Sequence, residues 1–212
     1  MTGRPSREEQ RDQLLEAALV HVPFDGWSRR SLMAGAADLG MDPGLARRLF
    51  PRGGDDLLAH LERWADRQMI ERVDPEALAR MPVRQRIATL VWARLEVLAP
   101  HREAMRRAAA ARLLPANALA CCASLWRSVD LMWSLAGDRA TDYSYYTRRA
   151  LLAAVWSSTF LYWLEDRSEG MRDSRAFLER RIEDVLKIGQ IRSRIEASLR
   201  GLGRLNPLTS RL

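Results

Sequence analysis

Residues 31–50 read SLMAGAADLGMDPGLARRLF, and this stretch decides the fold. Ala36 and Ala37 are small where two helices must cross closely, and Gly40 permits the sharp turn that follows the first helix. Pro43 fits the first turn of a short second helix, because a backbone N–H at that position would have no partner within the helix. The stretch therefore predicts a helix-turn-helix motif.

Helical periodicity continues on both sides of this motif. Ser6 and Glu9 form a capping box for a first helix, which is expected to end before Pro23 because a proline disfavours helical geometry in the preceding residue. Asp55 is a good cap for a longer helix that ends near Arg72. Further helices are predicted over residues 82–99, 102–114, 116–136, 142–165 and 174–188. The sequence has no alternating strand pattern, so the expected fold class is all-α.

The composition is that of a soluble globular protein. Of the 212 residues, 47% are hydrophobic and 29% are charged, and no apolar run reaches the roughly 18 residues of a membrane-spanning helix. The first ten residues lack the apolar stretch of a signal peptide. Cys121 and Cys122 lie in an apolar run, where burial should leave both thiols inert. These features predict a cytoplasmic protein without disulfides.

Catalytic and metal-binding motifs are scarce. His21, His60 and His101 are far apart, and the best metal-ligand spacing is that of Asp56 and His60, one helical turn apart. An exposed ion pair explains that spacing more simply. The sequence contains neither a phosphate-binding glycine loop nor a nucleophile elbow. We therefore expect no enzymatic activity and no metal site. An unrecognised enzyme is kept as a weaker hypothesis, behind the two that are developed below.

The charge distribution does not favour DNA binding by the helix-turn-helix. The chain has a net charge of +7, but residues 1–72 carry 11 arginines and 12 acidic residues. Attraction to phosphate dominates non-specific DNA affinity, and this region does not supply it. Arg47 and Arg48 can still contact phosphate or bases, but a solvated helix face is the simpler interpretation. No specific nucleic-acid partner is expected.

Together with Phe50-Pro51 and Leu57-Leu58, the helix-turn-helix resembles the N-terminal domain of the tetracycline-repressor (TetR) transcription factors. The resemblance implies a small N-terminal domain followed by a larger helical domain for ligand binding and dimerisation. Those repressors usually place an aromatic residue in the recognition helix and a lysine at the start of the fourth helix. This chain has Ala46 and Gly53 or Gly54 there, so both phosphate contacts are missing.

Five blocks of sequence resemble a narrower family, the lipid-binding accessory proteins of ubiquinone (coenzyme Q) biosynthesis, over about residues 10–188. The blocks are HVPFDGW at 21–27, FPRGG at 50–54, MWSLAGD at 132–138, TDYSYYTRRA at 141–150 and FLERRI at 177–182. The resemblance implies a TetR-like homodimer that does not bind DNA. It also implies a hydrophobic pocket for an isoprenoid or other lipid, and a docking surface for the di-iron hydroxylase that acts on demethoxyubiquinone.

The resemblance assigns the docking surface to residues Met132, Asp142, Tyr145, Tyr146 and Arg149. Tyr145 stands where the family commonly has tryptophan. Tyrosine and arginine are favoured at interfaces because they bury a large area and carry a polar group. Half-buried packing against a neighbouring helix remains the alternative for the two tyrosines.

Large side chains in the C-terminal half are the candidates for lining the lipid pocket. They are Trp126, Trp133, Trp156, Phe160 and Trp163. A filled hydrophobic core is the alternative for each of them. Apart from the bound lipid, which the family resemblance suggests is an isoprenoid quinone or a phospholipid, no cofactor is expected.

The C-terminal tail has the pattern of a basic amphipathic helix. Its apolar stripe consists of Ile188, Ile191, Ile195, Leu199 and Leu202, and Arg192 and Arg194 lie largely off the stripe. Such a helix can lie in a lipid interface with its cationic face against anionic headgroups. Docking on the protein's own body or on a second subunit is the alternative.

The sequence thus predicts a helix-turn-helix domain over 1–54, a lipid-binding and dimerisation domain over 55–188, and a membrane-associating tail over 189–212. The predicted function is that of an accessory protein of ubiquinone biosynthesis. It would present an isoprenoid quinone intermediate to demethoxyubiquinone hydroxylase at the cytoplasmic face of a bacterial inner membrane. The alternative is a TetR-type transcriptional regulator that senses a hydrophobic ligand.

Overall fold

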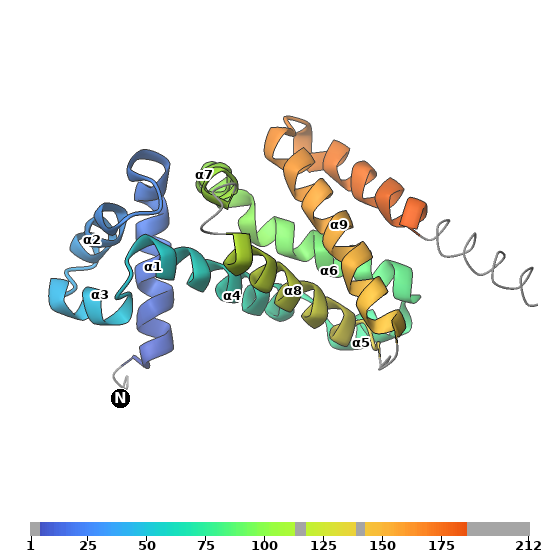
Figure 1. Ribbon diagram of the computed structural model, residues 1–212, viewed down its shortest axis with the longest axis horizontal. Coiled ribbons are helices and arrows are strands. Elements are labelled where there is room, and N and C mark those ends of the chain that lie inside the picture. The colour runs from blue at the N-terminus through green and yellow to red at the C-terminus, as the bar shows by residue number, and fades with distance from the viewer. Residues whose placement is uncertain (1–4, 113–117, 139–142, 186–212) are drawn as a thin grey trace, which may run out of the picture. The chain divides into compact units, whose positions relative to one another are not determined.

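The computed structural model describes residues 5–112, 118–138 and 143–185, and the regular elements in these ranges are all helices (Figure 1). The prediction of an all-α fold is confirmed. The α-helices are α1 (Arg7–Asp25), α2 (Arg29–Asp38), α3 (Pro43–Leu49), α4 (Gly54–Arg72), α5 (Pro75–Arg80), α6 (Val83–Leu98), α7 (Arg102–Arg112), α8 (Ala118–Leu135), α9 (Tyr143–Glu165) and a last helix over 172–185. Two 3-10 turns, Ala99–His101 and Glu169–Met171, complete the described elements.

The helix-turn-helix forms as predicted from α2 and α3, packed on α1. Gly40 adopts a φ of 60° in the turn, as its position in the motif requires. The closest crossing of α1 and α2 lies at Gly35, where a Cβ atom would be 2.6 Å from the backbone nitrogen of Ala18. Ala36 is buried, but Ala37 is exposed and takes no part in the crossing. The predicted motif is therefore confirmed, but the residue at the helix crossing is Gly35 and not the predicted pair Ala36 and Ala37.

Pro23 does not end the first helix, contrary to the sequence-based expectation. α1 begins with the predicted capping box of Ser6 and Glu9, and it continues through Pro23 to Asp25. A proline in the last turn removes one backbone hydrogen bond, which a helix of this length tolerates. The helix instead ends at Gly26, which has a φ of 68° and a backbone N–H that donates to the Val22 carbonyl.

The cap of α4 is Gly53, with a φ of 63°, rather than Asp55. A Cβ atom on the next residue, Gly54, would overlap the backbone carbonyl of Trp27. The start of α4 is therefore set by the close approach of two backbone segments, which only glycine permits. Asp55 and Asp56 lie in the first helical turn, where carboxylates interact favourably with the helix dipole.

α5 is not among the predicted helices, although its signal is present in the sequence. The side chain of Asp74 accepts a hydrogen bond from the backbone N–H of Glu76 at 2.9 Å, and Pro75 occupies the first helical position. An aspartate followed by proline is a common start of a helix. With six residues, α5 is too short to show a repeating apolar pattern, so hydrophobic periodicity alone does not detect it.

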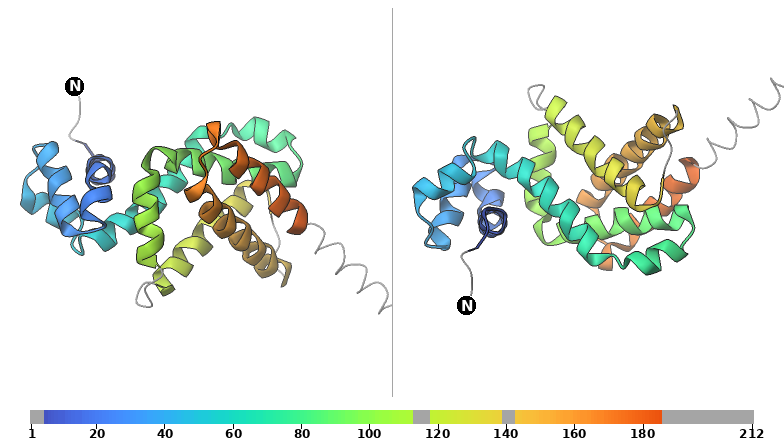
Figure 2. Two further views of the ribbon diagram at one scale, coloured as in Figure 1. Left: turned by 90° about the horizontal axis from the view of Figure 1, so that it is seen from above. Right: turned by 90° about the horizontal axis from the view of Figure 1, so that it is seen from below.

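The chain forms two compact units, residues 1–156 and residues 157–212, with the division inside α9. In the first unit, α4 extends from the helix-turn-helix to contacts with α6 and α8 (Figure 2). The core of this unit includes Leu90, Val91 and Leu95 of α6, which are fully buried. The indole N–H of Trp27 donates to the carbonyl of Ala104 at 3.1 Å and so joins the helix-turn-helix to α7.

The second unit is held together by aromatic contacts and by one carboxylate. The Tyr162 and Phe177 rings stack with centroids 4.4 Å apart, and the Trp163 indole donates to the Met171 sulfur. Asp166 accepts hydrogen bonds from the backbone N–H and the hydroxyl groups of both Ser168 and Ser174. Although burial raises the pKa of Asp166, these hydrogen bonds outweigh it and lower the pKa to about 2.

The two cysteines are not buried as predicted. Cys121 is half-buried beside α4, and Cys122 is exposed. The apolar run that contains them lies on α8, where only one face packs against other helices. Composition alone cannot tell a buried apolar run from an exposed one.

Candidate functional site

A network of ion pairs and hydrogen bonds joins α8 to α9, and its centre is the buried Arg149. The Arg149 side chain is 4% exposed and donates through Nε to Asp130 Oδ1 at 2.6 Å and through Nη1 to Asp138 Oδ2 at 3.0 Å. Asp138 also accepts from Arg148 at 2.6 Å. Arginines of α9 therefore hold one carboxylate on α8, Asp130, and one just after α8, Asp138. Arginine suits this position because its planar fork can bind two partners at once.

Tyr145 completes this network from one turn earlier on α9. Its hydroxyl donates to Asp130 Oδ1 at 2.9 Å, and the Arg149 guanidinium carbon lies 3.3 Å from the centroid of its ring. The hydrogen bond to Asp130 raises the pKa of the Tyr145 hydroxyl. Burial raises the pKa of Asp130, but the hydrogen bonds from Arg149 and Tyr145 outweigh it and lower the pKa. The position of Tyr145 is thus held by Asp130 at its hydroxyl and by Arg149 at its ring.

Tyr146 and Trp126 form the exposed part of the same assembly. Tyr146 is 61% exposed and Trp126 is 36% exposed. Their rings stack with centroids 6.2 Å apart, and Tyr146 meets Tyr145 edge-on at 5.1 Å. We call Trp126, Asp130, Asp138, Tyr145, Tyr146 and Arg149 the α8–α9 cluster.

The structure gives the predicted docking residues different places. Tyr146 is on the surface, Tyr145 is half-exposed, and Arg149 is buried beneath them. Met132 is 0% exposed, so its side chain packs in the core and is not available for contact with a partner on the surface of the chain. This corrects the inclusion of Met132 in an exposed surface. Asp142 lies outside the described residues.

The predicted lipid-lining residues are also divided between surface and core. Trp156, Phe160 and Trp163 are buried, whereas Trp126 is exposed and Trp133 is half-exposed with its indole N–H donating to the Arg148 carbonyl. A groove of about 350 Å³ between α4 and α8 and a pocket of about 170 Å³ beside α5 and α6 are lined by other residues. The assignment of these five residues to a lipid pocket remains a prediction.

A buried polar network in the core of the first unit was not apparent from the sequence. The Arg94 side chain is almost fully buried, and it donates to Asp66 at 2.8 Å and to Glu62 at 2.5 Å. The Ser128 hydroxyl also donates to Asp66, and the Trp156 ring lies 4.5 Å from the Arg94 guanidinium carbon. The network joins α4, α6, α8 and α9. Since the hydrogen-bonded pairs are 28 to 62 residues apart in sequence, no local sequence pattern predicts the network.

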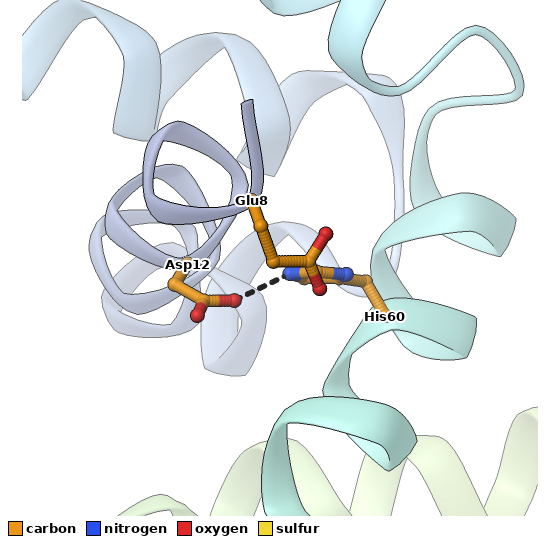
Figure 3. A group of neighbouring side chains, drawn as sticks. All are labelled: Glu8, Asp12 and His60. Atoms are coloured by element: carbon orange, nitrogen blue, oxygen red, sulfur yellow. Dashed lines mark hydrogen bonds and ion pairs between the residues drawn. The ribbon is translucent and has the colours of Figure 1, made fainter. Parts of the chain in front are cut away.

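A second polar group joins α1 to α4 at Glu8, Asp12 and His60, which can present ligand atoms within 4.8 Å of one another (Figure 3). Arg67 already places its guanidinium on both carboxylates, at 2.8 Å from Glu8 and 2.6 Å from Asp12. The positive charge that a metal ion would supply is therefore present. The His60 ring donates through Nε2–H to Asp12 Oδ1 at 2.7 Å, and burial lowers the pKa of His60 despite that contact. Asp56, the partner considered from sequence, instead binds Arg52.

Comparison with known proteins identifies the family. Residues 118–189, which include α8 and α9, match the family model described as COQ9. The chain is 35% identical over 208 residues to ubiquinone biosynthesis protein COQ9-B of Xenopus laevis, covering 93% of this chain and 71% of that protein. It is 32% identical to the human COQ9 protein, covering 93% of this chain and 65% of that protein.

The chain belongs to the COQ9 family of ubiquinone biosynthesis proteins. This confirms the family resemblance seen in the sequence. The chain spans 66% of COQ9-A of Xenopus laevis and 65% of the human COQ9 protein, both of which are named as mitochondrial. Among the described residues, no helix combines the length and the apolar character needed to cross a membrane.

The fold of this COQ9 family member is similar to that of a TetR transcriptional regulator from Nitrosomonas europaea, with a TM-score of 0.69. The match covers 84% of this chain and 98% of the regulator, at 23% sequence identity. The prediction of a TetR-like fold is therefore confirmed. At this identity the likeness concerns the fold alone.

Proposed function

We propose that this chain is a non-enzymatic, lipid-binding accessory protein of ubiquinone biosynthesis. It binds an isoprenoid quinone or a phospholipid, and it presents an isoprenoid quinone intermediate to demethoxyubiquinone hydroxylase. It acts as a homodimer on an anionic membrane surface, to which the tail over 189–212 contributes. Membership of the COQ9 family supports the pathway. The residues of the tail lie outside the described part of the chain, so the support for its role is the amphipathic sequence pattern.

The observation that carries the docking role is the exposed aromatic pair Tyr146 and Trp126 above the buried Arg149. An aromatic side chain held in place loses little conformational entropy when a partner covers it. The ion pairs of Arg149 with Asp130 and Asp138 fix the start of α9, and with it the position of Tyr146. A rigid aromatic centre with charged groups around it is the usual composition of an interface hot spot.

The sharpest variant for testing this role is Tyr146→Lys, because Tyr146 is the most exposed member of the α8–α9 cluster. We expect the variant to lose about 2 kcal/mol or more of binding to the hydroxylase, since a charge replaces an aromatic group that association would bury. The measurement is the amount of hydroxylase that co-purifies with each variant. Val20→Lys on α1 is the matched control, because Val20 is similarly exposed, at 66%, and lies in the helix-turn-helix.

Both variants should keep the melting temperature of the parent protein, because exposed substitutions usually change stability by only about 0.5 kcal/mol. Normal hydroxylase binding by a folded Tyr146→Lys protein would contradict the docking role. Tyr145→Lys is less informative, because Tyr145 also bonds Asp130 and its loss would disturb the ion-pair network.

The lipid-binding role is tested by mass spectrometry of lipids extracted from the purified protein. Removing an isoprenoid chain from a bilayer exposes apolar surface, and only an apolar pocket of the protein can replace the lost contacts. We expect an isoprenoid quinone or a phospholipid in the extract. A protein that is folded and binds hydroxylase but carries no lipid under any purification condition would contradict presentation of a lipid while leaving the docking role intact.

A further inference from the structure

The N-terminal half of α8 exposes apolar side chains to an unusual degree. Leu119 is 86% exposed, and Cys122, Ala123 and Trp126 are also exposed. These four residues are spaced by three, one and three positions, which places them on one face of the helix. The groove toward α4 is lined by Ala120, Cys121, Ser124 and Arg127, and also by Ala123, which lies at the edge of the exposed face. α8 therefore packs by one side and leaves a continuous apolar stripe, Leu119, Cys122, Ala123 and Trp126, on the surface.

The charge pattern around this stripe distinguishes a lipid from a protein partner. The sequence from Leu113 to Trp126 contains no charged residue. In sequence this segment is bounded by Arg112 and Arg127, of which Arg127 is exposed, and Arg107 is also exposed on the preceding helix, α7. Protein interfaces usually surround an apolar centre with a mixed polar rim. An uncharged apolar segment between two arginines is instead complementary to a bilayer, whose apolar interior is covered by anionic headgroups.

We propose that the N-terminal half of α8 inserts its exposed stripe into the interface of an anionic lipid bilayer. Leu119 and Cys122 enter the region between headgroups and acyl chains, and Arg107 and Arg127 contact the headgroups. Trp126 lies at the end of the stripe, where an indole ring suits the boundary between water and hydrocarbon. This membrane contact belongs to the first compact unit and does not involve the C-terminal tail. It shares Trp126 with the surface proposed for hydroxylase docking, whereas Leu119 and Cys122 lie outside that surface.

The two cysteines of the chain allow a direct test in the full-length protein. Cys121→Ser leaves Cys122 as the only thiol, and Cys122→Ser leaves only Cys121, which lies beside α4. Each variant is labelled with the same environment-sensitive fluorophore and mixed with vesicles of phosphatidylcholine and phosphatidylglycerol. We expect a blue shift and quenching by lipid-attached quenchers for the label at Cys122, and a smaller response at Cys121. Unchanged emission at Cys122 in the presence of these vesicles would overturn the proposal.

A second pair of variants tests the energetics without a label. Leu119→Glu should weaken partition onto the anionic vesicles by about tenfold, because it removes the most exposed leucine and adds a charge that must leave water. Val20→Glu, at an exposed position of α1, should bind as the parent does. Equal binding by the parent and Leu119→Glu proteins would overturn the proposal. A fall in the sedimentation mass of Leu119→Glu in the absence of vesicles would also overturn it, because the stripe would then cover a second copy of the chain.

Discussion

Helix α3 and the α8–α9 cluster use arginine and aromatic residues in opposite ways. On α3, Arg47 and Arg48 are exposed, and Phe50 at the end of the helix is fully buried. In the cluster, Arg149 is buried and Tyr146 is exposed. Exposed arginines favour contact with phosphate, whereas an exposed aromatic group above a buried arginine favours contact with protein. The difference supports our proposal that the partner-binding surface of this TetR-like fold lies on α8 and α9, away from its helix-turn-helix.

Replacing the buried arginine of the cluster should have the largest effect on stability. Arg149→Ala removes a cation from Asp130 and leaves Asp138, whose side chain is 2% exposed, with a weaker set of partners. Breaking a buried ion pair in this way costs about 3 kcal/mol. We expect a marked fall in melting temperature, and loss of hydroxylase binding through displacement of Tyr146.

Tyr145→Phe is the matched variant for this prediction. It removes one hydrogen bond to Asp130 and keeps the ring in contact with the Arg149 guanidinium, so it should cost only about 1 kcal/mol. A melting temperature of Arg149→Ala within a degree of the parent value would contradict the view that a buried arginine organises the cluster.

The sequence revealed the elements of the fold better than it revealed the contacts of the cluster. Gly40, Pro43 and the capping residue Ser6 act locally, so their roles are visible in a short window of sequence. The block TDYSYYTRRA pointed to α9 by family resemblance. It did not show that Tyr146 is exposed while Arg149 is buried, because that depends on the packing of α9 against α8.

Met132 and Cys122 illustrate the same limit. Both lie on α8 in apolar surroundings. The family resemblance predicts Met132 on the surface, and the apolar run predicts that Cys122 is buried. The structure has them the other way round, because the orientation of α8 is set by its packing against α4 and α6. Amphipathic patterns give the relative positions of side chains on one helix, but tertiary contacts decide which side is covered.

The helix-turn-helix should depend on the close crossing of α1 and α2 and not on its arginines. Gly35→Ala places a methyl group 2.6 Å from the backbone nitrogen of Ala18, so the two helices must move apart. Overpacking of this kind costs about 2 kcal/mol. The measurement is the free energy of unfolding by denaturant. Gly44→Ala on α3 is the control, since a Cβ atom there approaches side-chain atoms and no backbone: Asp42 Oδ1 at 2.9 Å and Arg48 Nη1 at 3.4 Å. Asp42 Oδ1 caps α3 by accepting from the Leu45 N–H, so we expect a loss of stability that is smaller than that of Gly35→Ala. Equal stability of the two variants would refute the crossing as a critical contact.

His60, which joins α4 to α1 near the helix-turn-helix, and Asp130 of the α8–α9 cluster should also respond to acid in different pH ranges. Burial lowers the pKa of His60 from 6.5 in the folded protein, so the unfolded chain binds a proton more readily. The stability from neutral His60 is complete above about pH 6.5 and is lost as the pH falls toward the lower folded pKa. For Asp130, whose pKa is lowered from 3.8, the loss begins only below about pH 3.8.

Melting temperatures measured between pH 7.5 and pH 5 test the histidine part. We expect a smaller effect than that of Gly35→Ala, and a flatter profile for His60→Gln than for the parent protein. The remaining slope should come from His101, whose pKa is also lowered by burial. A steeper profile for His60→Gln would mean that His60 is charged in the folded protein, and that Asp12 dominates over burial.

The smallest effect should come from the exposed arginines of α3. Arg47→Ala with Arg48→Ala should change the melting temperature little, because substitutions on an exposed helix face usually shift stability by about 0.5 kcal/mol or less. Hydroxylase binding should stay normal, because the α8–α9 cluster is unchanged. The parent protein should select no sequence from a random library of DNA duplexes at physiological salt, since residues 1–72 carry more acidic than basic residues. If the parent protein selects a pseudo-palindromic site that the double variant no longer binds, the functional surface includes α3. That result would favour the TetR-type regulator.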